Sequence, residues 1–265
     1  MIVAHLTNDT RSLLSCSLTS RSWYTAAVPH LHHALFMRVT PYNRHENTKW
    51  PKPLRVASQF GFLPFVTRLF IRLEGCDPKF SSKQLHHRTL RDFSALTNVR
   101  ELSIECLDIP SFMPKPQRYF GQFSQTLRSL TLPIPKGSVR EIVFFIGLFP
   151  HLEDLGLQCS YSYNMRELGD RTLFPPFVPT LRGRLVASGY GGDKLAKAMI
   201  DLFGRVRFHH MDLTHFGGVQ LLLDSCAGAL ETFQLYATEL RGGIFFSKVC
   251  GFQLTIYRRV LPSGL

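Results

Sequence analysis

The chain has 265 residues, of which 45% are apolar and 19% charged, so it can bury a sizeable core and is not generally disordered. Its net charge of +12 is spread along the sequence and forms no single basic stripe, which disfavours a dedicated nucleic-acid-binding protein. The six cysteines form no C-x-x-C pair, no secretory signal precedes them, and no apolar run approaches the roughly 18–20 residues of a membrane span. We therefore expect a soluble cytoplasmic or nuclear protein with reduced thiols.

The pattern along the chain divides it into four regions. Residues 1–40 have helical tendency, and residues 41–53 carry three prolines among polar residues and are expected to form a linker. Residues 54–240 carry a recurring apolar pattern that predicts short strands, and residues 241–265 do not continue it. We expect that last segment to be an irregular tail.

The helical region contains two stretches with a recognisable pattern. In RSLLSCSLTSRSW (11–23), Leu13 and Leu14 lie ten and nine residues before Trp23, with small and apolar residues between. The stretch PHLHHALF (29–36) ends in an apolar pair. Together they resemble the core of an F-box, whose third helix closes on a leucine followed by an aromatic residue. With the downstream pattern, residues 1–240 resemble fungal F-box proteins with divergent leucine-rich repeats.

The resemblance implies a function for this region. An F-box docks on the adaptor subunit of an SCF-type cullin–RING ubiquitin ligase, and about forty residues cannot bury so many apolar side chains alone. The expected adaptor-binding residues are therefore apolar, namely Leu6, Leu13, Leu14, Cys16, Leu18, Trp23, Leu35 and Phe36. The alternative is that these side chains form a core that joins the helices to the first repeat.

Two features depart from the F-box pattern. The family opens its first helix with a leucine–proline pair and an acidic residue, whereas this sequence begins at Met1 apparently inside that helix. Thr19 stands where the family prefers an apolar residue. Because the residues after 241 also leave the repeat, we expect a gene product that is truncated or imperfectly defined at both ends.

The recurring pattern is an apolar residue, two others, an apolar residue, one other and an apolar residue. Its last two apolar positions alternate, which places both side chains on one face of a short strand. The copies are Val66-Leu69-Ile71-Leu73, Val99-Leu102-Ile104, Leu127-Leu130-Leu132, Leu152-Leu155-Leu157, a weaker Leu181-Leu185-Ala187, Phe208-Met211-Leu213 and Leu230-Phe233-Leu235. They recur at intervals of 22 to 33 residues, close to the roughly 20–29 residues of leucine-rich repeats.

Helices are predicted between the later strands. Ser138 and Glu141 spell a capping box before an apolar stretch that runs to Phe149. Asp193 is expected to cap a helix that Gly204 ends, and residues 219–226 form another amphipathic stripe. Alternating strands and helices fit a closed barrel, a doubly wound sheet or a curved solenoid. The leucine pattern favours an α/β fold with an irregular leucine-rich-repeat solenoid and a parallel sheet.

The residues predict neither catalysis nor a bound cofactor. The histidine pairs 32–33, 86–87 and 209–210 are adjacent, whereas a helical metal site needs i,i+4 spacing and a third ligand. Residues 189–194 (GYGGDK) precede a helix but lack the spelling of a phosphate loop, and Asp193 would repel phosphate. No G-x-S-x-G elbow or paired acids occur.

The function expected from the sequence is therefore protein binding and not catalysis. The leading hypothesis is a non-enzymatic substrate receptor that binds the ligase adaptor through residues 1–40 and an unknown target protein through residues 54–240. An interaction scaffold independent of any ligase, in which the helices only cap the repeats, is the second hypothesis. A nucleic-acid-associated protein is the third, and a strong dependence of binding on salt would identify it.

Overall fold

The computed structural model describes residues 6, 9–39, 52–73, 92–105, 107, 109, 117–133, 137–158, 174–189, 192–204, 206–215, 217–237 and 253–258. The strands in this part of the chain are β1 (Ala34–Val39), β2 (Arg68–Leu73), β3 (Glu101–Glu105), β4 (Ser129–Pro133), β5 (Asp154–Gln158), β6 (Arg184–Ser188), β7 (His210–Thr214), β8 (Thr232–Ala237) and β9 (Gln253–Arg258). The helices are α2 (Thr10–Thr19), α3 (Arg21–Leu31), α4 (Lys52–Gln59), α6 (Gln117–Phe120), α7 (Val139–Ile146), α8 (Gly192–Phe203) and α9 (Val219–Cys226), with short 3-10 turns η1 (Leu63–Phe65), η2 (Asp92–Ala95) and η4 (Gly121–Phe123).

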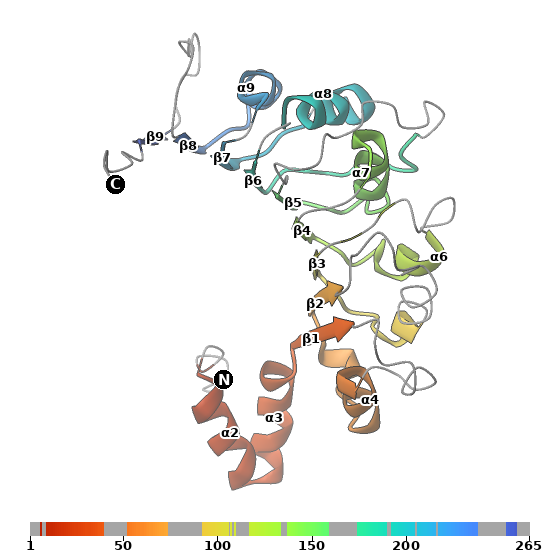
Figure 1. Ribbon diagram of the computed structural model, residues 1–265. Coiled ribbons are helices and arrows are strands. Elements are labelled where there is room, and N and C mark those ends of the chain that lie inside the picture. Colours follow the sequence, from red (N-terminus) through yellow and green to blue (C-terminus); the bar gives the residue numbers. More distant parts are fainter. Residues whose placement is uncertain are drawn as a thin grey trace, which may run out of the picture.

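The fold is mixed α/β with one all-parallel sheet, as the sequence predicted at that level. The strands pair in sequence order from β1 to β9, and every pair is parallel. They line the inner side of an arc whose outer side carries α4 and α6 to α9 (Figure 1). Parallel strands are about 4.8 Å apart whereas packed helices are about 8–10 Å apart, so the helical side must spread and the sheet must curve.

The register of the sheet aligns the predicted apolar positions into continuous rows. Leu69 on β2 pairs with Leu102, and the row runs on through Leu130, Leu155, Leu185, Met211 and Phe233. These side chains are buried beneath the helices, and so is the apolar residue that leads each copy of the pattern, from Val66 to Leu230. A shift of one residue would expose a whole row, so burial fixes the register.

The same backbone geometry recurs at the entrance to successive strands. The N–H groups of Thr67 and Arg68 both donate to the carbonyl of His33, and those of Arg100 and Glu101 both donate to Thr67. Equivalent pairs donate to the carbonyls of Arg100, Arg128 and His209. The described strands therefore repeat one structural unit, in agreement with the sequence pattern.

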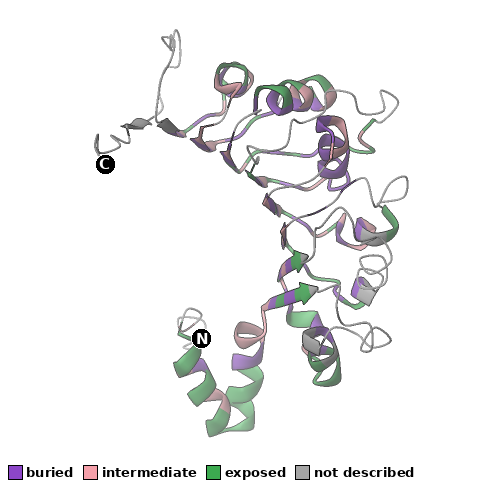
Figure 2. Cartoon of the chain, viewed as in Figure 1, coloured by how far each residue is buried: buried purple, intermediate pink, exposed green. Residues whose placement is uncertain are grey.

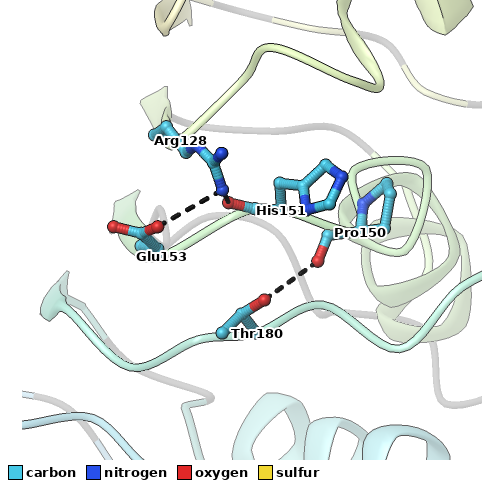
Figure 3. A network of polar contacts seen from close by, with 5 residues as sticks. All are labelled: Arg128, Pro150, His151, Glu153 and Thr180. Atoms are coloured by element: carbon cyan, nitrogen blue, oxygen red, sulfur yellow. Dashed lines mark hydrogen bonds and ion pairs between the residues drawn. The ribbon is translucent and has the colours of Figure 1, made fainter.

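Polar contacts also join neighbouring units where α7 leads into β5 (Figure 3). The Arg128 guanidinium donates to the carbonyl of His151 at 3.2 Å and reaches the Glu153 carboxylate at 3.3 Å. The Thr180 hydroxyl donates to the carbonyl of Pro150 at 3.1 Å, from the segment that leads into β6. These bonds fix the turn between a helix and a strand against the units on both sides.

Aromatic side chains fill the space under the sheet. Phe145 on α7 meets Phe120 and Phe149 edge to face, with ring centroids 4.9 and 5.6 Å apart. All three rings are buried. The capping box predicted at Ser138 is present, since Ser138 accepts from the N–H of Glu141 and the Glu141 carboxylate accepts from the N–H of Ser138.

Several predicted boundaries were wrong. The helical region does not extend to residue 40, because residues 34–39 form β1, where Leu35 and Met37 are buried and Phe36 and Arg38 are exposed. Such alternation suits a strand and not a third helix. The expected linker 41–53 overlaps α4 at its end, and its residues 40–51 lie outside the described residues.

Two smaller predictions also need correction. Asp193 does not cap its helix, because α8 already begins at Gly192 and Asp193 lies in its first turn. The segment 241–265 is not wholly irregular, because residues 253–258 form β9 and pair with β8, Leu254 opposite Phe233. In the sequence, Leu254 and Ile256 repeat the apolar alternation of the other strands.

Candidate protein interaction surfaces

The first candidate surface is the pair of helices α2 and α3. Asp9 caps α2 by accepting from the N–H of Ser12, and hydrogen bonds from Ser12 lower the pKa of the Asp9 carboxyl. Ser20 separates the two helices and caps α3 by accepting from the N–H of Trp23. Ser20 thus ends one helix and begins the next, so the chain changes direction there. The two helices pack against one another at the N-terminal end of the arc (Figure 1).

Among the residues that the structure describes, the helix pair has a very small core of its own. Leu13 and Ala27 are its fully buried members, and Leu6 and Leu31 pack against them. Much of the rest of α2 and α3 is exposed (Figure 2). The exposed residues include Leu18 at 87%, Leu14 at 51%, Tyr24 at 46% and Trp23 at 37%. Leu14 and Leu18 are four residues apart and so lie on one face of α2.

The structure separates the eight predicted adaptor-binding residues into two groups. Leu14, Leu18 and Trp23 are exposed on the helices, and Cys16 is half-buried there. Leu13 is buried in the helix pair and Leu35 in the large core under the sheet, so neither presents its side chain to a partner. Leu6 is partly buried. Residues 1–5, where the first helix was expected, lie outside the described residues.

Phe36 belongs to a different surface from the one predicted for it. It is 67% exposed on the face of β1 that is turned away from the helices, and it stacks on Phe70 of β2, with ring centroids 4.5 Å apart. The two residues are also register partners. This aromatic pair is the start of a row of register partners on the exposed face of the sheet. The row continues on successive strands through Ser103, Thr131, Gly156, Val186, Asp212 and Gln234.

The second candidate surface is this exposed sheet face, which is the inner side of the arc. Three ion pairs join neighbouring strands on this face. Arg68 meets Glu101 at 2.9 Å, Arg72 meets Glu105 at 3.4 Å, and Arg184 meets Asp212 at 3.0 Å. Exposed pairs of this kind contribute little to stability, but they neutralise the face locally in a basic chain.

A hollow of about 420 Å³ lies on this face over β4, β5 and β6. Its lining includes Thr131, Gly156 and Val186 from the central row, and Asp154, Arg184 and Ser188 from the flanking rows. The hollow exists because Gly156 has no side chain where its neighbours in the row have one. Concave sites with an apolar floor and a few polar groups are the usual form of a binding site.

Where the structure describes them, the glycine-rich and histidine motifs of the sequence form no such site. Gly189 has a φ of 100°, and its N–H already donates to the carbonyl of Thr214 at the end of β7. His209 and His210 face Glu231, and His210 also bonds the Thr232 hydroxyl. His86 and His87 lie outside the described residues. In the part of the chain that the structure describes, no three metal-ligating side chains come together.

The comparisons with known proteins identify no family. Searches against protein-family models, curated proteins and solved structures found no match for this chain. Among the described residues, no helix has the length and apolar character needed to cross a membrane. The candidate surfaces therefore rest on the geometry of this chain alone.

Proposed function

We propose that this chain is a non-enzymatic substrate receptor of an SCF-type cullin–RING ubiquitin ligase. In this proposal α2 and α3 are the part of an F-box that binds the ligase adaptor, and the parallel sheet with its helices is an irregular leucine-rich-repeat solenoid that binds a target protein. The observation that carries the proposal is the helix pair, whose own core contains Leu13 and Ala27 and which exposes Leu14, Leu18 and Trp23.

The energetics of the helix pair favour a binding role. Among the described residues, the core between α2 and α3 has two buried side chains, which is far too few to stabilise two helices in isolation. Burying Leu18 and Leu14 against a partner would contribute about 1.5–3 kcal/mol for each fully covered side chain. Aromatic and aliphatic anchors of this kind dominate the free energy of most protein interfaces.

The repeat identity is supported by the sheet. Sequential parallel strands, a continuous row of buried Leu-type residues and a backbone bond that recurs at the entrances of β2 to β5 and of β8 are typical of a solenoid. One feature departs from the F-box resemblance, since β1 occupies the place of the third helix. The proposed docking surface therefore uses α2 and α3 and excludes Leu35 and Phe36.

The proposed receptor forms and breaks no covalent bond. By holding the target on one surface and the ligase on another, it raises the effective concentration of the target at the ubiquitin-transfer centre. The exposed sheet face and the helix pair lie in different parts of the arc, so one need not block the other (Figure 1).

The test is co-purification of the ligase adaptor with the full chain. The L14Q/L18Q double variant should lose at least about 90% of the adaptor, because each anchor contributes more than about 1 kcal/mol. Leu221 on α9 is 43% exposed, so L221Q is a matched control that should retain the adaptor. Replacing Leu13 is not a valid test, because Leu13 is buried and its loss would unfold the helices.

A second function is a ligase-independent scaffold in which the helix pair caps the solenoid. His32 at the end of α3 stacks on Phe62 beside η1, which gives the helices a structural contact with the first repeat. A chain lacking residues 1–31, and so keeping β1, distinguishes the two. Aggregation of that chain, together with no adaptor binding by the full protein, would favour the cap.

A further inference from the structure

Two glycines shape the hollow. Gly156 lies in β5, and Gly183 directly precedes β6. A Cβ at Gly156 would lie 2.9 Å from the Thr131 hydroxyl oxygen, so a larger residue would close the hollow and displace Thr131. A Cβ at Gly183 would collide with the Asp154 carboxylate. The first glycine therefore keeps the floor open, and the second lets Asp154 sit at the rim.

Asp154 is held in place at that rim. Its Oδ1 accepts a hydrogen bond of 2.6 Å from the backbone N–H of Arg184 on the neighbouring strand. A backbone amide is neutral, so this bond orients the carboxylate without cancelling its charge. The guanidinium of Arg184, which also lines the hollow, is paired with Asp212 at 3.0 Å. The uncompensated charge in this group of three is therefore one negative charge.

The floor of the hollow is apolar. Val186 is 42% exposed beside Gly156, although it stands on a strand in the middle of the sheet. The opposite rim is uncharged, with Pro133, Gln158 and Ser188. The described lining thus combines an apolar floor with a negative charge at the Asp154 end. Lysine and arginine have the matching form, an aliphatic stem with a cationic head.

We propose that this hollow binds a lysine or arginine side chain from an extended segment of the target protein. The stem lies over Gly156 and against Val186, and the cationic head bonds the Asp154 carboxylate. This inference rests on the proposed function, since a target protein is what the sheet face of a receptor would hold. Charge complementarity selects this occupant over a neutral apolar side chain.

The backbone of the segment is expected to lie across the strands. The N–H and C=O groups of β4, β5 and β6 already pair with their neighbours, so the segment cannot add to the sheet as a strand there. Recognition must come from side chains on the exposed face. The cationic side chain in the hollow is then the anchor, and Ser188 and Gln158 offer hydrogen bonds to the segment around it.

The experiment uses a displayed library of random twelve-residue peptides panned against the full chain. The enriched peptides should share a lysine or an arginine. A synthetic peptide from that set should bind the chain more weakly as the salt concentration rises. D154N keeps an oxygen that accepts from Arg184 but removes the charge, and it should weaken binding by about tenfold. V186R should weaken it at least as much, because it fills the hollow and repels a cation.

Two variants on the outer side of the arc serve as matched controls. D224N removes one exposed carboxylate from α9, and L221R changes an aliphatic residue as exposed as Val186. Both should bind the peptide as the wild type does. Enriched peptides without a basic residue, no enrichment at all, or equal effects of D154N and D224N would overturn the proposal.

Adaptor binding measured on the same preparations separates this inference from the proposed function. If the adaptor binds but peptide binding does not depend on Asp154, the hollow is not the target site and the receptor function stands. If peptide binding depends on Asp154 but no adaptor binds, the basic-side-chain site stands and the ligase function falls.

Discussion

His32 stacks face to face on Phe62, with ring centroids 3.6 Å apart and planes within 8° of parallel. His32 is the C-cap of α3, and Phe62 is the residue that precedes η1. The contact therefore joins the helix pair to the repeat region. It also partly buries the imidazole, and this burial lowers the pKa of His32 because it disfavours the charged ring.

That shift predicts how His32 affects stability with pH. Since the folded pKa lies below the unfolded value of about 6.5, the unfolded chain takes up the proton first as the pH falls. The contribution of His32 is fully present above about pH 6.5 and is lost as the pH falls toward the folded pKa. H32F keeps a ring on Phe62 but cannot titrate. Its free energy of unfolding should match the wild type at pH 7.5 and exceed it at pH 5, by urea denaturation. If H32F and the wild type differed in free energy of unfolding by the same amount at pH 7.5 and at pH 5, the titration of His32 would not affect stability.

The capping box predicts a local loss of stability at α7. S138A should lower the free energy of unfolding by about 1 kcal/mol, since it leaves the N–H of Glu141 without its acceptor. E141Q keeps an oxygen that can accept from the N–H of Ser138 and should cost less. Chemical denaturation of both variants measures the difference. A larger loss for E141Q would mean that charge, and not the reciprocal bonds, stabilises the helix start.

The aromatic contacts under the sheet predict a large effect at Phe145. F145A removes a buried ring that touches Phe120 and Phe149, and it should cost about 3–5 kcal/mol of unfolding free energy. Phe174 is exposed, so F174A makes the same chemical change without a cavity and should cost less than about 1 kcal/mol. Similar losses for the two variants would show that α7 does not pack as described.

Cys226 on α9 is predicted to be unreactive in the folded protein. Burial raises the pKa of its thiol to about 11, so little thiolate is present at pH 8. Iodoacetamide should therefore modify Cys226 at least about a hundredfold more slowly in buffer than in urea. Cys16 is half-buried and should react sooner. Peptide mapping by mass spectrometry gives both rates, and rapid labelling of Cys226 in buffer would contradict the packing of α9.

Local sequence predicted those parts of the fold that depend on local alternation. Leu102 and Ile104 predict a strand because apolar residues at alternate positions share one face of a strand. Both are buried, and so is Val99, the apolar residue three positions before Leu102. Leu35 and Met37 alternate in the same way, but the F-box resemblance predicts a helix there, whereas the structure has β1. The local pattern was the better guide at that point, since β1 needs only a neighbouring strand to pair with.

The candidate sites depend on packing that no local pattern contains. Leu13 and Leu14 are adjacent and chemically identical, and only the position of α3 decides that the first is buried and the second exposed. The hollow needs Gly156 to lie between Thr131 and Val186, and that register is set by strand pairing across separate repeats. A glycine in a strand was the one available signal, because it often marks a close approach.

The most direct test of the receptor function is a titration of the purified full-length chain with the purified ligase adaptor. The account predicts saturable binding of one adaptor per chain, weakened at least about tenfold by L14Q/L18Q and unchanged by L221Q. Absence of binding, or equal affinity for the wild type and L14Q/L18Q, would contradict it.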